Sequence, residues 1–294
     1  GKQSGAPYGM VFSEDLTRFY IADNDDNRDK IVYQYKISVV DAEESLISSN
    51  LKKVVADGKA TARISVTAKD RDGDTISGVR VRLSADNSNV TIQNVRNTTN
   101  SSGVATFDVS HDKAGEVEFR ASGMGIEIED RVSVGFATVD QNNSLIAVNR
   151  KKVLANGSAR ATVTVTARDK DGDPIGGVDF KLNSRGHTDV EIDNSNSKTD
   201  SDGKATFLVT SRSYGTTEFI AEGLGVKLEG VSVRFVDVDP EESEVVAESR
   251  KVLANNSAEG IITVIARDED GDELEGAPVR LRSDSDHPNI ENST

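Results

Sequence analysis

The sequence predicts an all-β chain of consecutive β-sandwiches, and three observations lead to this prediction. A segment of the form Asp-x-Asp-Gly-Asp occurs three times, and its glycines Gly73, Gly172 and Gly271 are 99 residues apart (172 − 73 and 271 − 172). Apolar and polar residues alternate with a period of two around each copy. Turns rich in Gly, Asn and Asp separate these stretches, and few segments carry a helical apolar stripe. A constant period over most of a chain indicates an array of one unit.

The alternation gives the strands of each unit in order. Residues 60–68 alternate and are matched by residues 159–167; further strands are expected at residues 79–83, 103–107 and 132–136. About seven such half-buried strands in a unit of roughly 100 residues is the pattern of an immunoglobulin-like sandwich. The core expected for the first unit is Ile64, Val66, Val81, Leu83, Phe107, Val109, Phe119 and Val134.

The period also divides the chain into segments. We expect a β-rich N-terminal segment at residues 1–40, sandwiches at residues 41–140 and 141–239, and an incomplete third sandwich at residues 240–294. The third copy lacks everything that matches Gly203 onward, so it is either part of a longer array or is completed by a partner strand. We favour the longer array. The junctions are short and not rich in Gly and Ser, which predicts an extended, semi-rigid rod.

The N-terminal segment does not match the repeat. It predicts three short strands, at residues 8–13, 17–22 and 30–37. Its order of residues resembles one blade of a β-propeller, of the form Gly-x-x-Phe-Ser-x-Asp-Gly-Thr-x-x-Tyr, although Leu16 stands where that pattern has glycine. One blade does not bury both of its faces. A partial domain, or a β-element docked on the first sandwich, is the alternative.

Composition restricts the classes of partner. The net charge of −15 disfavours nucleic acid and anionic lipid, both of which repel an acidic surface. No apolar run approaches the length of a membrane span, so direct membrane insertion is not expected. The chain has no cysteine, and domains of roughly 100 residues fold without disulfides. A cysteine-free repeat protein fits a bacterial or archaeal surface.

The aspartate loops are the sharpest chemical feature of the sequence. Three carboxylates within five residues could share a hard cation such as Ca²⁺. The candidate ligands are Asp70, Asp72, Asp74, Asp169, Asp171, Asp173, Asp268, Asp270 and Asp272. The spacing differs from an EF-hand, because the twelfth position from the first aspartate holds an apolar residue expected in the core. A hairpin turn with solvated carboxylates is the favoured interpretation, and calcium is the alternative.

Catalytic motifs are not found. The three histidines occupy unrelated positions of the repeat and have no zinc-ligand spacing. No Gly-x-Ser-x-Gly elbow and no phosphate-binding glycine loop occurs. We therefore expect no enzyme activity and no catalytic or cofactor-binding residue.

The repeat resembles a known family. The residues that carry the resemblance are Val66-Thr-Ala-Lys-Asp70, Thr99-Asn-Ser-Ser-Gly103, Asp169-Lys-Asp-Gly-Asp-Pro174 and Thr199-Asp-Ser-Asp-Gly203. Over residues 42–294 the unit is similar to the tandem bacterial immunoglobulin-like domains of invasin and intimin-type outer-membrane adhesins. In that family such domains form a stalk that projects a binding tip from the cell. The resemblance implies an extracellular, cell-surface role.

Two functions follow as hypotheses. The first is an adhesin stalk segment that spaces a binding region from the cell, with a host or matrix ligand bound by regions outside these residues. The second is a structural subunit of a filament, sheath or particle coat, assembled by β-strand complementation between chains. The expected partners are accordingly other surface proteins or neighbouring copies of the chain.

Overall fold

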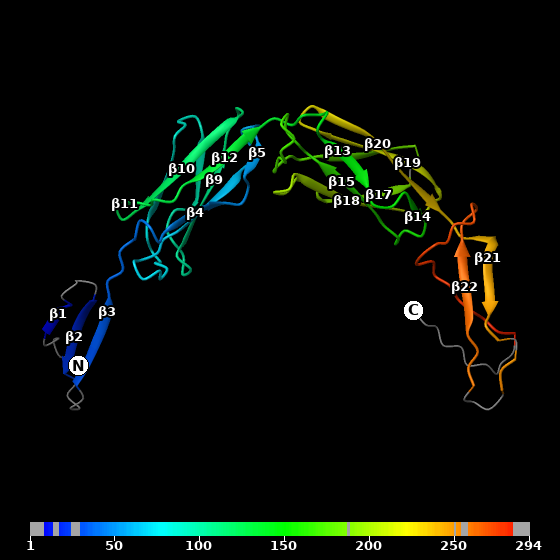
Figure 1. Cartoon of the computed structure of the whole chain (residues 1–294), viewed down its shortest axis with the longest axis horizontal. Helices are drawn as coiled ribbons and strands as arrows, with labels where there is room; N and C mark the ends of the chain where they lie inside the picture. Colours follow the sequence, from blue (N-terminus) through cyan, green and yellow to red (C-terminus); the bar gives the residue numbers. More distant parts are fainter. Residues whose placement is uncertain are drawn as a thin grey trace, which may run out of the picture. The chain divides into compact units, whose positions relative to one another are not determined.

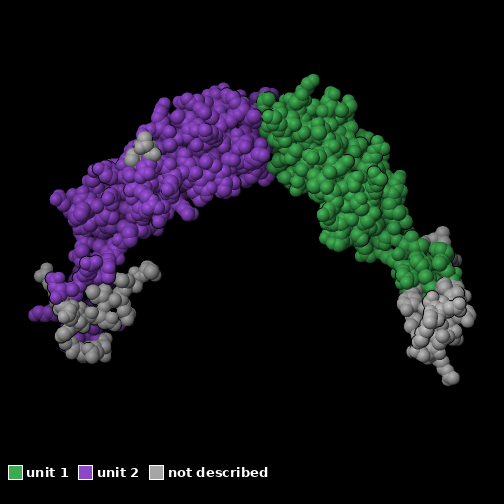
Figure 2. Space-filling model, turned by 180° about the vertical axis from the view of Figure 1, so that it is seen from behind, with its two compact units in different colours: residues 1–138 green, residues 139–294 purple. Residues whose placement is uncertain are grey.

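The structure is a computed structural model that describes residues 9–13, 18–24, 30–186, 189–249, 251–253 and 258–284. Every helix or strand element within these residues is a β-strand, so the all-β prediction is confirmed (Figure 1). The chain divides into two compact units, residues 1–138 and 139–294, which Figure 2 colours separately. Within the described ranges no helix is long and apolar enough to cross a membrane.

The first unit begins with a three-stranded antiparallel sheet. Its strands are β1 (Gly9–Phe12), β2 (Arg18–Asn24) and β3 (Lys30–Lys36), in that order. Phe12 is paired with Phe19 and Phe19 with Tyr35, and the rings of Phe19 and Tyr35 stack with their centres 4.7 Å apart. These strands lie where the sequence predicts them. The likeness to a propeller blade stays a prediction.

The first sandwich follows as two facing sheets. One sheet contains β4 (Leu46–Ser49), β6 (Ala62–Thr67), β9 (Val104–Ser110) and β8 (Thr91–Arg96), in that order. The other contains β11 (Ile126–Glu127), β10 (Gly115–Gly123), β12 (Val132–Ala137) and β5 (Lys53–Val55), with β7 (Val81–Ala85) also paired to β10. All eight residues of the predicted core are buried. The period-2 alternation therefore identifies the inner face correctly.

The second unit repeats this arrangement. One sheet contains β13 (Leu145–Val148), β15 (Ala161–Thr166), β18 (Lys204–Ser211) and β17 (Val190–Asn196). The other contains β14 (Lys152–Leu154), β20 (Val226–Val236), β19 (Gly215–Gly223) and β16 (Lys181–Gly186). Phe207, Phe219 and Phe235 are completely buried between the sheets.

Each sandwich contains one parallel strand pair, whereas the alternation predicts antiparallel sheets. The first strand of each sandwich is divided, so that β4 joins one sheet and β5 the other, and β13 and β14 do the same. The second part of each runs parallel to the last strand, β5 to β12 and β14 to β20. This pairing places Lys152 directly beside Arg234.

The third repeat is represented by a two-stranded antiparallel sheet of β21 (Asp239–Ala247) and β22 (Ile262–Arg267). Within the described part of the chain, β22 has one neighbour, whereas the equivalent β15 has two. Val245 and Ile261 are accordingly 66% and 57% exposed.

Candidate functional site

Each Asp-x-Asp-Gly-Asp segment forms a closed turn. In the first, Lys69 and Thr75 form an antiparallel bridge, and the N–H of Gly73 donates to the carbonyl oxygen of Asp70 at 2.9 Å. Gly73 has a φ of 82°, a conformation that glycine adopts without steric cost. The second and third loops contain the same bridge and the same bond. The segments thus have the hairpin-turn geometry that the Asp-Gly pair predicts.

The first aspartate of each loop is a structural acceptor. Asp70, Asp169 and Asp268 are only 4%, 5% and 0% exposed. In each case Oδ1 accepts hydrogen bonds from the backbone N–H groups two and four residues later, at 2.9–3.1 Å. The later aspartates are more exposed, with the side chains of Asp72 and Asp74 at 67% and 73%. The sequence presents the three carboxylates as equivalent, and the structure does not.

The first loop surrounds the end of a lysine side chain. Lys36, the last residue of β3, places its Nζ 2.7 Å from Asp70 Oδ2, 2.9 Å from Asp72 Oδ2 and 2.7 Å from Asp74 Oδ2. Ser38 Oγ also donates to Asp70 Oδ2, at 3.0 Å. The segment that leads into the first sandwich therefore supplies both a charge and a hydroxyl to this loop.

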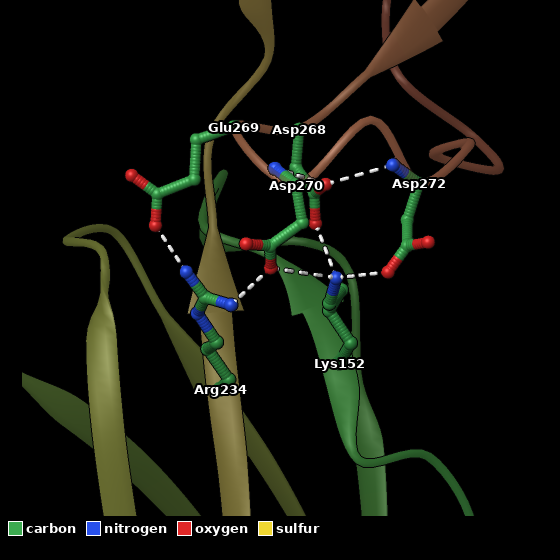
Figure 3. A network of polar contacts seen from close by, with 6 residues as sticks. All are labelled: Lys152, Arg234, Asp268, Glu269, Asp270 and Asp272. Carbon is green, nitrogen blue, oxygen red and sulfur yellow. Dashed lines mark hydrogen bonds and ion pairs between the residues drawn. The ribbon is translucent and has the colours of Figure 1, made fainter.

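The third loop has the same arrangement with a different lysine. Lys152, at the start of β14, places its Nζ 2.6 Å from Asp268 Oδ2 and 3.3 Å from Asp270 Oδ2, and it also contacts Asp272 Oδ2. Arg234, on the neighbouring β20, pairs with Glu269 and Asp270. Figure 3 shows the two cations reaching the loop from adjacent strands. The third loop thus carries a second ion-paired cation beside its lysine.

The second loop has the same turn. Asp171 is paired with the adjacent Lys170, with 2.8 Å between Lys170 Nζ and Asp171 Oδ1. Asn143 Nδ2 donates to the carbonyl oxygens of Asp169 and Lys170, at 3.0 and 3.1 Å. Side-chain hydrogen bonds therefore tie the loop to the residues just before β13.

The ion pairs shift the protonation equilibria of both partners. Burial alone would raise the pKa of Asp268, but hydrogen bonds from Lys152 Nζ and from the N–H groups of Asp272 and Asp270 outweigh it and hold the pKa below its usual value. The pKa of Asp70 is lowered in the same way, with Lys36 and Ser38 as its side-chain donors. Hydrogen bonds to Asp70 and Asp74 raise the pKa of Lys36, and bonds to Asp268 and Asp272 raise that of Lys152. All of these groups are therefore charged at neutral pH.

Sequence reasoning missed the lysines and a repeated serine. Ser45, Ser144 and Ser243 each accept the N–H of the residue that precedes the first aspartate, through Oγ at 2.9–3.0 Å. These serines keep the 99-residue spacing, so the period itself could have identified them. Lys36 lies outside the repeat, and no such signal points to it.

The chemistry of the loops suits a cation. In the first and third loops the three carboxylates each offer an oxygen within 4.8 Å of the others. A lysine ammonium has three N–H donors and one positive charge, which match three acceptor oxygens. Calcium at these aspartates stays a prediction, and it would have to share the same oxygens with the lysine.

Comparisons with known proteins agree with the fold. The family model described as bacterial Ig-like domain (group 1) matches residues 44–137 and 143–236. Among solved structures, the chain is similar to invasin, described as a bacterial integrin-binding protein, with 19% identity, 79% of this chain and 48% of that chain covered, and a TM-score of 0.33. The chain thus spans about half of the invasin chain.

Two further structures are similar. The D0–D1 domains of intimin are 25% identical, with 64% of this chain and 96% of that chain covered and a TM-score of 0.30. The Escherichia coli adhesin FdeC is 20% identical, with 82% and 78% covered and a TM-score of 0.33. No curated protein sequence matches at a significant level. Because the two segments matched by the family model coincide with the two complete sandwiches, the chain belongs to the bacterial Ig-like domain (group 1) family.

Proposed function

We propose that the chain is a non-catalytic stalk segment of a bacterial surface adhesin, which holds a binding region away from the cell. The observation that carries this proposal is the direct succession of two family sandwiches. The last strand of the first ends at Ala137 and the first strand of the second begins at Leu145. So short a connection suits spacing better than independent action of the two domains.

The proposal includes a location and a class of partner. The chain lies outside the cell, at its surface, and the ligand is a host or matrix molecule bound by regions beyond these residues. Other surface proteins and neighbouring copies of the chain are further partners. The net charge of −15 supports this choice over nucleic acid or anionic membranes.

A second candidate function rests on the third repeat. Among the described residues β22 pairs only with β21, and this edge, together with exposed Val245 and Ile261, favours a strand that adds to this sheet. If a neighbouring chain supplies the strand, the protein is a structural subunit of a filament, sheath or coat.

Light scattering on the purified chain distinguishes these two functions. A stalk segment stays monomeric over a wide range of concentration, whereas a coat subunit forms ordered polymers. Antibodies raised against the purified chain should also label intact cells of the source organism. Labelling only after lysis would contradict both functions.

A further inference from the structure

We propose that the Asp-x-Asp-Gly-Asp loop is a socket for a lysine of the preceding element, and that this contact fixes a repeat against what comes before it. The socket is defined by the three aspartates of a loop, Asp70, Asp72 and Asp74 in the first repeat and Asp268, Asp270 and Asp272 in the third. This inference goes beyond the stalk function and holds equally for a coat subunit.

The first and third loops make this contact with unrelated donors. Lys36 ends an antiparallel three-stranded sheet outside the repeat, whereas Lys152 begins a strand that is parallel to its neighbour in the second sandwich. Both nevertheless place Nζ among all three carboxylates of the loop that follows. The loop is therefore the constant part of the contact, and only the lysine is supplied differently.

The buried aspartate makes a cation necessary. Asp268 Oδ1 already accepts hydrogen bonds from two backbone N–H groups, so Oδ2 is the oxygen that still requires a partner. The side chain of Asp268 is 1% exposed, and Lys152 meets its Oδ2 at 2.6 Å. A carboxylate buried without a counter-charge is strongly unfavourable. Removal of the lysine should therefore disturb the contact between the two repeats and not only a surface pair.

The third loop differs from the other two in the charge of one residue. The residue after the first aspartate is Arg71 in the first loop, Lys170 in the second and Glu269 in the third. Only Glu269 is acidic, and it pairs with Arg234. The position that matches Arg234 in the first sandwich is Gly135, 99 residues earlier (234 − 99). The Arg234–Glu269 pair therefore adds a second contact that distinguishes the third loop from the other two.

Distance measurements on the whole chain test the socket. The chain has no cysteine, so spin labels can be attached to cysteines introduced at Asp202, in a turn of the second sandwich, and at Val245, on β21. We expect one narrow distance distribution in the otherwise unchanged chain and the loss of that narrow peak in Lys152→Met. Methionine keeps much of the side-chain volume and removes the charge. A Lys152→Met distribution as narrow as the original would overturn the proposal.

Two controls separate the socket from a general effect of charge or folding. Lys227→Met removes an ion pair with Glu229 inside the same sandwich and should leave the distribution narrow. In about 1 M salt, where the screening length falls to about 3 Å, the unmutated chain should keep its narrow distribution, because the buried pair of Lys152 and Asp268 is screened much less than an exposed pair. A distribution that broadens with Lys227→Met, or in salt alone, as much as with Lys152→Met would also overturn the proposal.

Discussion

Two independent features disfavour any side chain at Gly203. Its φ is 72°, and a Cβ at this position would lie 2.5 Å from the carbonyl oxygen of Ala167. That oxygen is part of the backbone, so no side-chain rotation relieves the contact. We expect Gly203→Ala to lower the free energy of unfolding by about 2 kcal/mol or more, measured by urea unfolding of the whole chain.

Gly225 is the matched control for this substitution. Its φ is 81°, but no heavy atom lies within 4 Å of where its Cβ would be. Gly225→Ala should therefore cost only the conformational strain, about 1 kcal/mol. Equal losses for the two variants would show that the contact with Ala167 contributes nothing.

At single residues the sequence predicts burial well and polar partners poorly. Ile64 and Phe107 are buried as their place in the alternation requires. Asp70 is also buried, although the sequence does not distinguish it from Asp72 and Asp74. Burial of an aspartate depends on which backbone N–H groups its carboxylate can reach, and the closed turn decides that.

The contribution of the third aspartate loop to stability should decrease at acidic pH. The folded pKa of Asp268 lies below its unfolded value, so its contribution to stability is present above the unfolded pKa, about 4, and is lost as the pH falls through the folded pKa. The groups that face Asp268 are Lys152, Asp270 and Asp272. We expect the spin-label distribution to broaden below about pH 4.

Lys152→Met provides the comparison for the acid response. Without the lysine, burial opposes ionisation of Asp268 with less compensation, so the dependence on acid should shrink or reverse. The unfolding midpoints of both chains from neutral pH to about pH 2.5 measure this difference. Parallel pH profiles would mean that Lys152 does not control the ionisation of Asp268.

Calcium binding by the aspartate loops remains a prediction, and the lysines make it testable because they compete with the ion for the same carboxylates. An ion that binds only the folded state stabilises it by RT ln(1 + c/Kd), where c is the concentration of free calcium, and here it must displace an ammonium group from the same three carboxylates. We expect about 1 mM Ca²⁺ to leave the unfolding midpoint of the unmutated chain unchanged and to raise that of Lys152→Met.

The two other outcomes of the calcium titration are equally informative. Equal stabilisation of both chains would mean that calcium does not compete with Lys152 for the carboxylates of the third loop. No shift in either chain would mean that the loops are turns without metal affinity. Magnesium is a suitable control ion, because it demands near-ideal octahedral geometry at shorter distances than calcium and gives up its waters reluctantly.

Strand pairing within the sandwich was only partly predictable. The alternation at residues 60–68 and 159–167 identified β6 and β15 with their inner faces. The parallel pairing of β14 with β20 left no mark in the sequence, because a three-residue strand is too short to show a period. It is this pairing that places Lys152 beside Arg234.

At the scale of the whole molecule, the period of 99 residues makes each sandwich a copy of the other. The family model matches two segments of the chain, at residues 44–137 and 143–236, which begin 99 residues apart (143 − 44). A change in one copy therefore has a built-in comparison at the equivalent position of the next.

The sequence by itself determined the all-β class, the repeat, the strands that alternate over five or more residues and the turn in each aspartate loop. These are local properties: alternation places side chains on one face, and Asp-Gly supplies the positive φ of the turn. Only the tertiary structure decided which cation enters a loop. Lys36 and Asp74 are 38 residues apart, whereas Lys152 and Asp272 are 120 apart. The same contact at such different separations follows from how the strands pack, and a linear pattern does not contain it.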